Sequence, residues 1–362
     1  MNQKHNTKSA LNEKDGIPQP DSLSASSLQK IVISRKLQPS ATELIKGILN
    51  HDKVALSRAI TLVESTNITH LAKANEIINV CLPHANQSVR IGITGVPGVG
   101  KSTFIEAFGS YLTSLGKKVA VLAVDPSSTI SHGSILGDKT RMEELVKDEK
   151  AYIRPSASGE TLGGVARKTR EAIILCEAAG FDMIIIETVG VGQSETAVHS
   201  MVDFFLLLKI SGAGDELQGI KRGIMEMADA IVINKADGDN INKAKLAKTE
   251  FNRALHLFPA KSSGWIPTVS TCSAYEKTGI DAVWETISRY LDLVTTNDYF
   301  ESKRKEQSLY WMMETINEQL KQNFYQHPDI AKLITTTQQA VLANELSPFA
   351  AAQKLLEFYF RK

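Results

Sequence analysis

Six short runs of apolar residues alternate with amphipathic stretches through the middle of the chain. The runs occupy residues 89–94, 119–124, 181–188, 202–210, 229–236 and 266–273. Each run is apolar throughout rather than at every second position, which is typical of strands buried on both faces of a parallel sheet. Between the first two runs, Phe104, Phe108 and Leu112 share one helical face, and Gly116 follows as a helix stop. The pattern predicts an α/β fold with a doubly wound, mainly parallel sheet.

Helical extensions are predicted on both sides of this region. Residues 40–82 repeat apolar positions at helical spacing, which predicts two or three helices. Beyond Leu291 the strand pattern ends. An apolar stripe then steps by three and four residues through Leu309, Met313, Ile316, Leu320 and Phe324. Ser347 and Pro348 predict the start of a final helix, because proline is favoured in a first helical turn.

Changes in composition and in the apolar pattern divide the chain into four parts. The first 38 residues are rich in Ser, Asn, Gln, Lys and Pro and predict a disordered lead-in. A helical segment over residues 39–85, an α/β domain over 86–296 and a helical arm over 297–362 follow.

Charge and cysteine content narrow the classes of protein that fit. Lys and Arg total 41 and Asp and Glu total 40, a balance that argues against a nucleic-acid binder. Cys81, Cys176 and Cys272 lie far apart, which favours reduced structural thiols over disulfides or a zinc site. The sequence has no signal-peptide core and no run of about 18 apolar residues. We therefore expect a soluble cytoplasmic protein that does not span a membrane.

The segment GVPGVGKST follows the first apolar run and fits the pattern G-x-x-x-x-G-K-[ST]. Its residues are Gly95, Val96, Pro97, Gly98, Val99, Gly100, Lys101, Ser102 and Thr103. Glycines let successive backbone N–H groups converge on phosphate oxygens, and the following helix adds partial positive charge. In such a loop Lys101 would bridge the β- and γ-phosphates, and the Ser102 hydroxyl would bind Mg²⁺.

Two later segments indicate which base is bound. Asn234, Lys235 and Asp237 follow an apolar run, at the edge where parallel sheets bind ligands. A carboxylate at Asp237 can accept hydrogen bonds from guanine N1–H and the 2-amino group, whereas adenine offers neither donor. After the next run, the segment Ser273, Ala274 and Tyr275 is placed to donate a backbone hydrogen bond to guanine O6. The three elements in this order favour GTP over ATP.

Candidate residues for metal binding and hydrolysis lie at the ends of two other runs. Glu187 ends the third run and would hold Mg²⁺ through water, while the Gly190 N–H would contact the γ-phosphate. Asp125 and Asp138 are further candidate metal acids. Gln193 is a candidate for positioning the attacking water, although a plain polar loop residue fits equally well. Since no clear water-positioning residue is present, we expect a weak intrinsic GTPase.

The chain contains the longer stretches GVPGVGKST, VAVDPSS, GSILGDKTRM, TLGGVARKTREA, ETVGVGQSE, GAGDELQGIKRGIMEMAD and NKAD. Together they resemble the MeaB/ArgK family of G-protein chaperones for adenosylcobalamin-dependent acyl-CoA mutases. The resemblance implies a SIMIBI-class P-loop GTPase that acts as a homodimer through its C-terminal arm. It also implies that the protein binds methylmalonyl-CoA mutase or a close relative, gates cobalamin loading and protects the mutase from inactivation.

The same resemblance assigns roles to individual positions. The metal and switch acids are Asp125, Asp138 and Glu187, and the segment that begins at Gly212 matches an additional switch that signals to the mutase. Within that switch the charged candidates are Asp215, Glu216 and Lys221.

The chain departs from the family pattern at two places. Residues 129–133 read TISHG where the family has P-F-T-G-G, which predicts a stiffer first switch. Ile210 and Ser211 stand where the family has Leu and Pro.

Two other functions use a similar nucleotide site. A metal-delivery GTPase for nickel-enzyme maturation needs a store of His or Cys residues, but His132 and His199 are isolated here. A transport-linked kinase for basic amino acids, an older description of the family, needs an acceptor-activating base, and none is evident. Phosphate released to water would indicate a GTPase, whereas phosphate transferred to a substrate would indicate a kinase.

Overall fold

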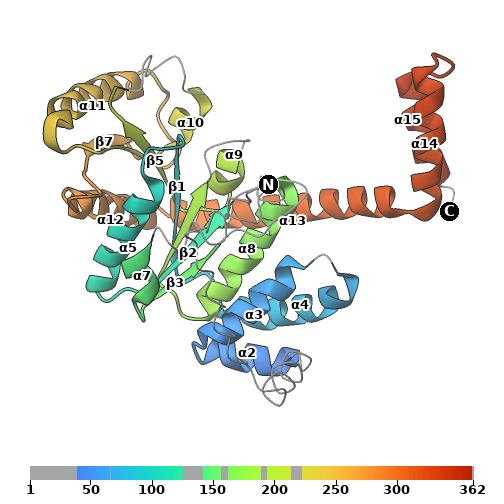
Figure 1. The fold of residues 1–362 in the computed structure, drawn as a ribbon, viewed down its shortest axis with the longest axis horizontal. Helices are drawn as coiled ribbons and strands as arrows, with labels where there is room; N and C mark the ends of the chain where they lie inside the picture. Colours follow the sequence, from blue (N-terminus) through green and yellow to red (C-terminus); the bar gives the residue numbers. More distant parts are fainter. Residues whose placement is uncertain are drawn as a thin grey trace, which may run out of the picture. The chain divides into compact units, whose positions relative to one another are not determined.

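In the computed structural model the described residues are 39–65, 67–124, 142–155, 162–188, 194–212 and 222–360 (Figure 1). Within them, seven parallel strands form one sheet in the order β3-β2-β4-β1-β5-β6-β7. The strands are β1 (Val89–Gly95), β2 (Val119–Val124), β3 (Ala151–Arg154), β4 (Met183–Thr188), β5 (Phe204–Ile210), β6 (Ala230–Asn234) and β7 (Thr268–Thr271). The predicted doubly wound, parallel α/β fold is confirmed. The edge strand β3 was not predicted.

Helices cover both faces of this sheet, and further helices precede β1 and follow β7 in the chain. They are α2 (Ala41–Leu49), α3 (Lys53–Glu64), α4 (Ile68–Cys81), α5 (Lys101–Ser114), α7 (Glu143–Lys147), α8 (Leu162–Ala178), α9 (Ser194–His199), α10 (Arg222–Met227), α11 (Ile241–Leu255), α12 (Ile280–Thr296), α13 (Tyr299–Gln326), α14 (Pro328–Leu342) and α15 (Pro348–Phe360). The three helices α2 to α4 match the predicted number, and α15 begins at the predicted proline. The helix α14 was not predicted.

The continuous apolar runs are explained by hydrophobic cores on both faces of the sheet. In β4, Ile184 and Ile186 pack in the core that contains α2, α3, α4 and α8. Their neighbours Met183 and Ile185 pack in the other core, with α5 and α12. Since successive side chains of a strand point to opposite faces, both sets must be apolar.

The end of α5 also follows the sequence. Gly116 has a φ of 87°, a left-handed conformation that favours glycine. The Lys117 N–H donates to the Leu112 carbonyl at 3.1 Å, which satisfies a carbonyl of the last turn. The chain can therefore turn back at once to enter β2.

All three cysteines are buried free thiols, as predicted. Burial raises the pKa of Cys81 to about 11, so this thiol stays protonated at neutral pH. Among the described residues, no helix is both long and apolar enough to cross a membrane.

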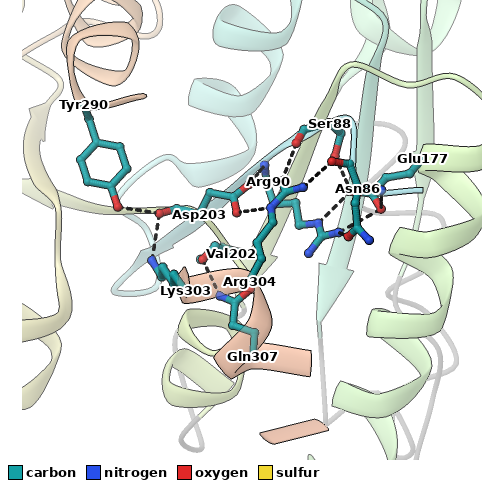
Figure 2. Close-up of polar contacts among 10 residues, drawn as sticks. All are labelled: Asn86, Ser88, Arg90, Glu177, Val202, Asp203, Tyr290, Lys303, Arg304 and Gln307. Carbon is teal, nitrogen blue, oxygen red and sulfur yellow. Dashed lines mark hydrogen bonds and ion pairs between the residues drawn. The ribbon is translucent and has the colours of Figure 1, made fainter. Parts of the chain in front are cut away.

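A buried ionic cluster joins α13 to the amino ends of β1 and β5 (Figure 2). Arg304 donates from Nε and Nη2 to the Asp203 carboxylate at 2.9 and 2.7 Å. On the other side of the cluster, Arg90 pairs with Glu177 at 2.8 and 2.9 Å. The Arg90 backbone N–H also donates to Asp203 at 2.8 Å, which connects the two pairs. Because these groups are almost fully buried, each charge depends on its partner for stabilisation.

Candidate nucleotide-binding site

The glycine-rich loop connects β1 to α5 and has the backbone geometry of a phosphate cradle. Gly98 and Gly100 have φ values of 80° and 91°, both in the left-handed region that favours glycine. Gly100 is the N-cap residue of α5, and a Cβ there would lie 2.8 Å from the Asn234 amide nitrogen. Val96 and Pro97 are exposed, whereas Val99 is buried and anchors the loop. The N–H groups of the first turn of α5, including Ser102 and Thr103, point toward this loop.

Lys101 is buried at the base of the loop. Its ammonium donates to the Gly95 carbonyl at 2.9 Å and the Val96 carbonyl at 3.4 Å. Burial lowers the pKa of Lys101, and the negative charges of Glu187 and Glu195 partly offset that effect. A phosphate group brought to the loop would supply further negative charge to this ammonium.

Asn234 and Lys235, which were predicted to recognise the guanine base, also hold the phosphate loop in place. The Asn234 side chain donates to the Val99 carbonyl at 2.9 Å and accepts the Ala274 N–H at 3.1 Å. It therefore links the loop after β1 to the loop after β7. Lys235, in a left-handed conformation with φ of 57°, donates to the Gly98 carbonyl at 2.9 Å.

Asp237 and Ser273 lie at the same edge of the sheet and contact each other. The Ser273 hydroxyl donates to the Asp237 carboxylate and accepts the Glu276 N–H at 3.1 Å. A tight turn holds Ser273, since its backbone exchanges two hydrogen bonds with Thr278, each 3.0 Å long. Tyr275 in the same turn is 87% exposed. The structure thus brings together the predicted base-reading residues next to the phosphate loop.

Glu187 lies beside the phosphate loop at the carboxyl end of β4. It is buried and in register with Ile93 of β1, and the neighbouring Thr188 hydroxyl donates to the Thr94 hydroxyl at 2.8 Å. A buried carboxylate beside the phosphate loop suits Mg²⁺, which takes one or two carboxylates together with phosphate and water oxygens. Among the described residues no group of three or more Asp, Glu, His or Cys side chains gathers. The Glu187 carboxylate and the Ser102 hydroxyl are oxygen donors of the kind that binds magnesium.

Several predicted residues lie outside the described residues. They are Asp125, residues 129–133, Asp138, Gly190, Gln193, Asp215, Glu216 and Lys221. Gly212 is described at the end of β5 and has a φ of 81°. Ser211 beside it donates from its hydroxyl to Asn240 at 2.8 Å, so the departure from Leu-Pro at 210–211 is accommodated by a hydrogen bond.

Glu195 was not predicted as a site residue. It lies in the first turn of α9 and is 5% exposed, and its charge acts on Lys101. The sequence carried one signal for it, since an acid is favoured in the first turn of a helix, where it interacts well with the helix dipole. The prediction stopped at Gln193 because the start of α9 was not recognised.

A parallel sheet with a phosphate cradle after β1 and Asn-Lys-x-Asp after β6 defines a P-loop guanine-nucleotide-binding protein. The chain belongs to the family described as methylmalonyl Co-A mutase-associated GTPase MeaB, whose model matches residues 56–329. The family resemblance inferred from the sequence, and with it GTPase activity, is confirmed.

Relatives in bacteria and animals agree with this assignment. A probable GTPase of Mycobacterium tuberculosis is 48% identical over 87% of this chain and 94% of its own length. GTPase ArgK of Escherichia coli is 45% identical, over 89% of this chain and 97% of its own. The mouse protein "methylmalonic aciduria type A homolog, mitochondrial" is 45% identical, over 90% and 81% respectively. A crystal structure described as LAO/AO transport system kinase superposes with a TM-score of 0.71 at 39% identity, covering 90% of this chain and 99% of that one.

Proposed function

We propose that this GTPase serves an adenosylcobalamin-dependent acyl-CoA mutase, with methylmalonyl-CoA mutase as the client. In this proposal its GTP cycle gates cofactor loading and protects the mutase from inactivation. The observation that carries the proposal is the extent of the family match. The model for mutase-associated GTPases covers residues 56–329, which include most of α3 and all of α4 and α13 as well as the nucleotide site. The likeness therefore includes elements that a bare GTPase does not need.

The described residues support a division of labour in hydrolysis. The first turn of α5 and Lys101 would bind the β- and γ-phosphates, and Asp237 with the turn at Ser273 would select guanine. Ser102 and Glu187 would hold Mg²⁺, which neutralises charge on the phosphates. A water molecule then displaces GDP from the γ-phosphoryl group, giving GDP and phosphate. We expect Asp125, Asp138, Gly190 and Gln193 to complete this machinery.

We also propose that the arm forms a homodimer. The stripe residues Leu309, Met313, Ile316 and Leu320 are 62, 52, 43 and 56% exposed, so the chain's own α/β domain does not cover them. Further along, Phe349, Leu356 and Phe360 line an open apolar groove on α15. Exposed apolar surface of this kind is stabilised by a partner, and a second copy presents the same surface.

The client proposal is tested by phosphate release from GTP, with and without purified methylmalonyl-CoA mutase. We expect the mutase to stimulate hydrolysis, because a partner that prefers one nucleotide state must alter the cycle in return. Replacing Asp215, Glu216 and Lys221 together with alanine should reduce the stimulation and leave basal turnover unchanged. Equal turnover with and without mutase, together with no nucleotide-dependent co-purification, would contradict the proposal.

The kinase alternative rests on the description of the similar crystal structure as a transport system kinase. Radiolabelled γ-phosphate distinguishes the two functions. Label that appears only as inorganic phosphate in the presence of lysine, arginine or ornithine supports hydrolysis. Label on the amino acid supports a kinase.

A further inference from the structure

One face of α13 holds the connection between α9 and β5, residues 200–203. The Trp311 indole N–H donates to the Ser200 carbonyl at 3.2 Å, and the Gln307 amide donates to the Val202 carbonyl at 2.9 Å. Lys303 donates to the Asp203 carbonyl at 2.9 Å, beside the Arg304 pair with the Asp203 carboxylate (Figure 2). Since residues 303, 304, 307 and 311 recur at helical spacing, a single helix face makes all of these contacts.

The same connection continues into the nucleotide site through α9. This short helix begins at Ser194, six residues after Thr188 ends β4, and its first turn carries the buried Glu195 that acts on Lys101. Its last turn lies close against β1, where a Cβ on Gly92 would be 3.0 Å from Val198. Because Gly92 lies in the strand that leads into the phosphate loop, α9 bridges the loop and α13.

A cavity leaves room on the outer side of α9. It measures about 200 Å³ and lies between α8, α9 and α13. The lining includes Thr196 and Ala197 of α9, Arg167 of α8, and Tyr310, Trp311 and Glu318 of α13. The contacts of Trp311 and Gln307 therefore fix the carboxyl end of α9, while its flank borders open space. An element held at one end beside a cavity can adopt a second arrangement at low cost.

We propose that Gln307 and Trp311 are positioning residues for GTP hydrolysis and act on the nucleotide site by holding the carboxyl end of α9. Through them the state of the C-terminal arm and the state of the nucleotide influence each other. The proposal rests on the GTPase activity of the family and is independent of which protein is the client. Neither residue touches the nucleotide, and no motif in the sequence marks them.

Kinetics of two variants test the proposal. Gln307→Ala removes the hydrogen bond to Val202, and Trp311→Phe keeps an aromatic ring but removes the N–H donor to Ser200. For each we expect kcat for GTP to fall about three- to tenfold. The dissociation constants for GTP and GDP should stay within about twofold, since the phosphate and base contacts are intact. Glu306→Ala, an exposed position one residue from Gln307, is the matched control and should behave like the parent protein.

A spectroscopic measurement keeps the proposal testable if a variant folds poorly. The parent protein, labelled with 5-fluorotryptophan, gives signals from Trp265, Trp284 and Trp311, assigned by single Trp→Phe substitutions. We expect the ¹⁹F resonance of Trp311 to differ between the GDP form and a form with a non-hydrolysable GTP analogue. Trp265 donates to the Asp229 carbonyl directly before β6 and Trp284 packs against Phe108 of α5, so both serve as internal references. An unchanged Trp311 resonance, or variants with unchanged kcat, would overturn the proposal.

Discussion

Arg304 and Asp203, 101 residues apart in the chain, form a buried two-pronged ion pair at 2.9 and 2.7 Å. The pair fastens the first turns of α13 to the start of β5. Burial raises the pKa of Asp203, but the hydrogen bonds and charge of Arg304 outweigh that effect and leave the pKa below its ordinary value. The pair thus favours the ionised form of the Asp203 carboxylate despite its burial.

Loss of Arg304 should strongly destabilise the fold. Arg304→Ala leaves the Asp203 carboxylate buried without its main partner, and we expect the free energy of unfolding to fall by about 3–5 kcal/mol. Urea unfolding followed by circular dichroism measures this change. Arg253→Ala, at an exposed position of α11, is the control and should change the value by less than about 0.5 kcal/mol. A loss of under about 1 kcal/mol for Arg304→Ala would mean that water reaches Asp203.

His199 should make stability depend on pH. Its pKa is lowered to about 4, mainly by burial and in part by the Lys303 charge, while Asp229 opposes the change. An unfolded histidine has a pKa of about 6.5, so the unfolded chain binds the proton first as the pH falls. Stability is therefore full above about pH 6.5 and decreases by about 3 kcal/mol toward pH 4.

Removing the imidazole tests this assignment. His199 packs edge-on against Phe205 with ring centroids 5.4 Å apart, so His199→Phe keeps an aromatic contact. The variant should show a flatter stability profile between pH 4 and 6.5 than the parent. His256→Phe, which alters an exposed histidine, should retain the parent slope. An unchanged slope in His199→Phe would assign the pH dependence to other groups.

Lys101→Ala should abolish hydrolysis without unfolding the protein. The lysine donates hydrogen bonds to loop carbonyls in this structure, and its charge is placed for phosphate. We expect kcat/KM for GTP to fall by about 100-fold or more, with a melting temperature close to that of the parent. Lys117→Ala, an exposed lysine after α5, is the control. Undiminished turnover in Lys101→Ala would remove the loop from the active site.

Asp237→Asn should change the base preference. An amide can donate to the C2 oxygen of xanthine, whereas a carboxylate repels it. We expect GTP affinity to fall about 100-fold and affinity for the xanthosine nucleotide to rise. Isothermal titration with both nucleotides measures this change of preference. Asp239→Asn in the same loop is the control. Retained guanine preference would place base selection at another residue.

The oligomeric state should depend on the exposed stripe of α13. Leu309→Asp together with Ile316→Asp places two charges on the stripe, and light scattering should then report a monomer. The contacts of Arg304, Gln307 and Trp311 lie on the buried face of the helix, so the fold should survive. Gln319→Asp, exposed on the same helix, is the control. A double variant that stays dimeric would locate the interface elsewhere.

This experiment replaces a truncation at residue 297, which the sequence alone would suggest. The structure shows that such a cut also removes Arg304 from the buried cluster. A truncated chain would then lose stability as well as the arm, and its oligomeric state would be uninformative.

The sequence predicted the elements whose signals are local. Six strands were found because each is a continuous apolar run, and the phosphate loop was found because its residues are adjacent. The strand β3 was missed because its four residues form an edge, where two side chains are only partly buried. The helix α14 was missed because its exposed surface weakens the apolar repeat, with Ile330 and Thr337 alone buried among its residues.

Contacts between distant residues could not be predicted in the same way. The sequence predicted that Asn234 contacts the guanine base. Its hydrogen bonds to Val99 and Ala274, however, depend on three loops meeting at one edge of the sheet. The cluster of Arg90, Glu177, Asp203 and Arg304 likewise has no spacing rule, because four separate elements contribute to it. Glu195, Gln307 and Trp311 were missed for the same reason, because only the tertiary fold brings them to their contacts.

The closure of this cluster by α13 also has a consequence for biosynthesis. Arg304 also donates to the backbone carbonyl of Asn86, 218 residues earlier, so a nascent chain holds Asp203 without its guanidinium partner until Arg304 has left the ribosome. Translation adds about 5–20 residues each second, so the 101 residues from Asp203 to Arg304 take on the order of ten seconds to make. During this interval the N-terminal helices and the first strands of the sheet are already made, but the Asp203 carboxylate lacks the charge of Arg304. We therefore expect chaperones on the ribosome to engage this chain until the first turns of α13 emerge.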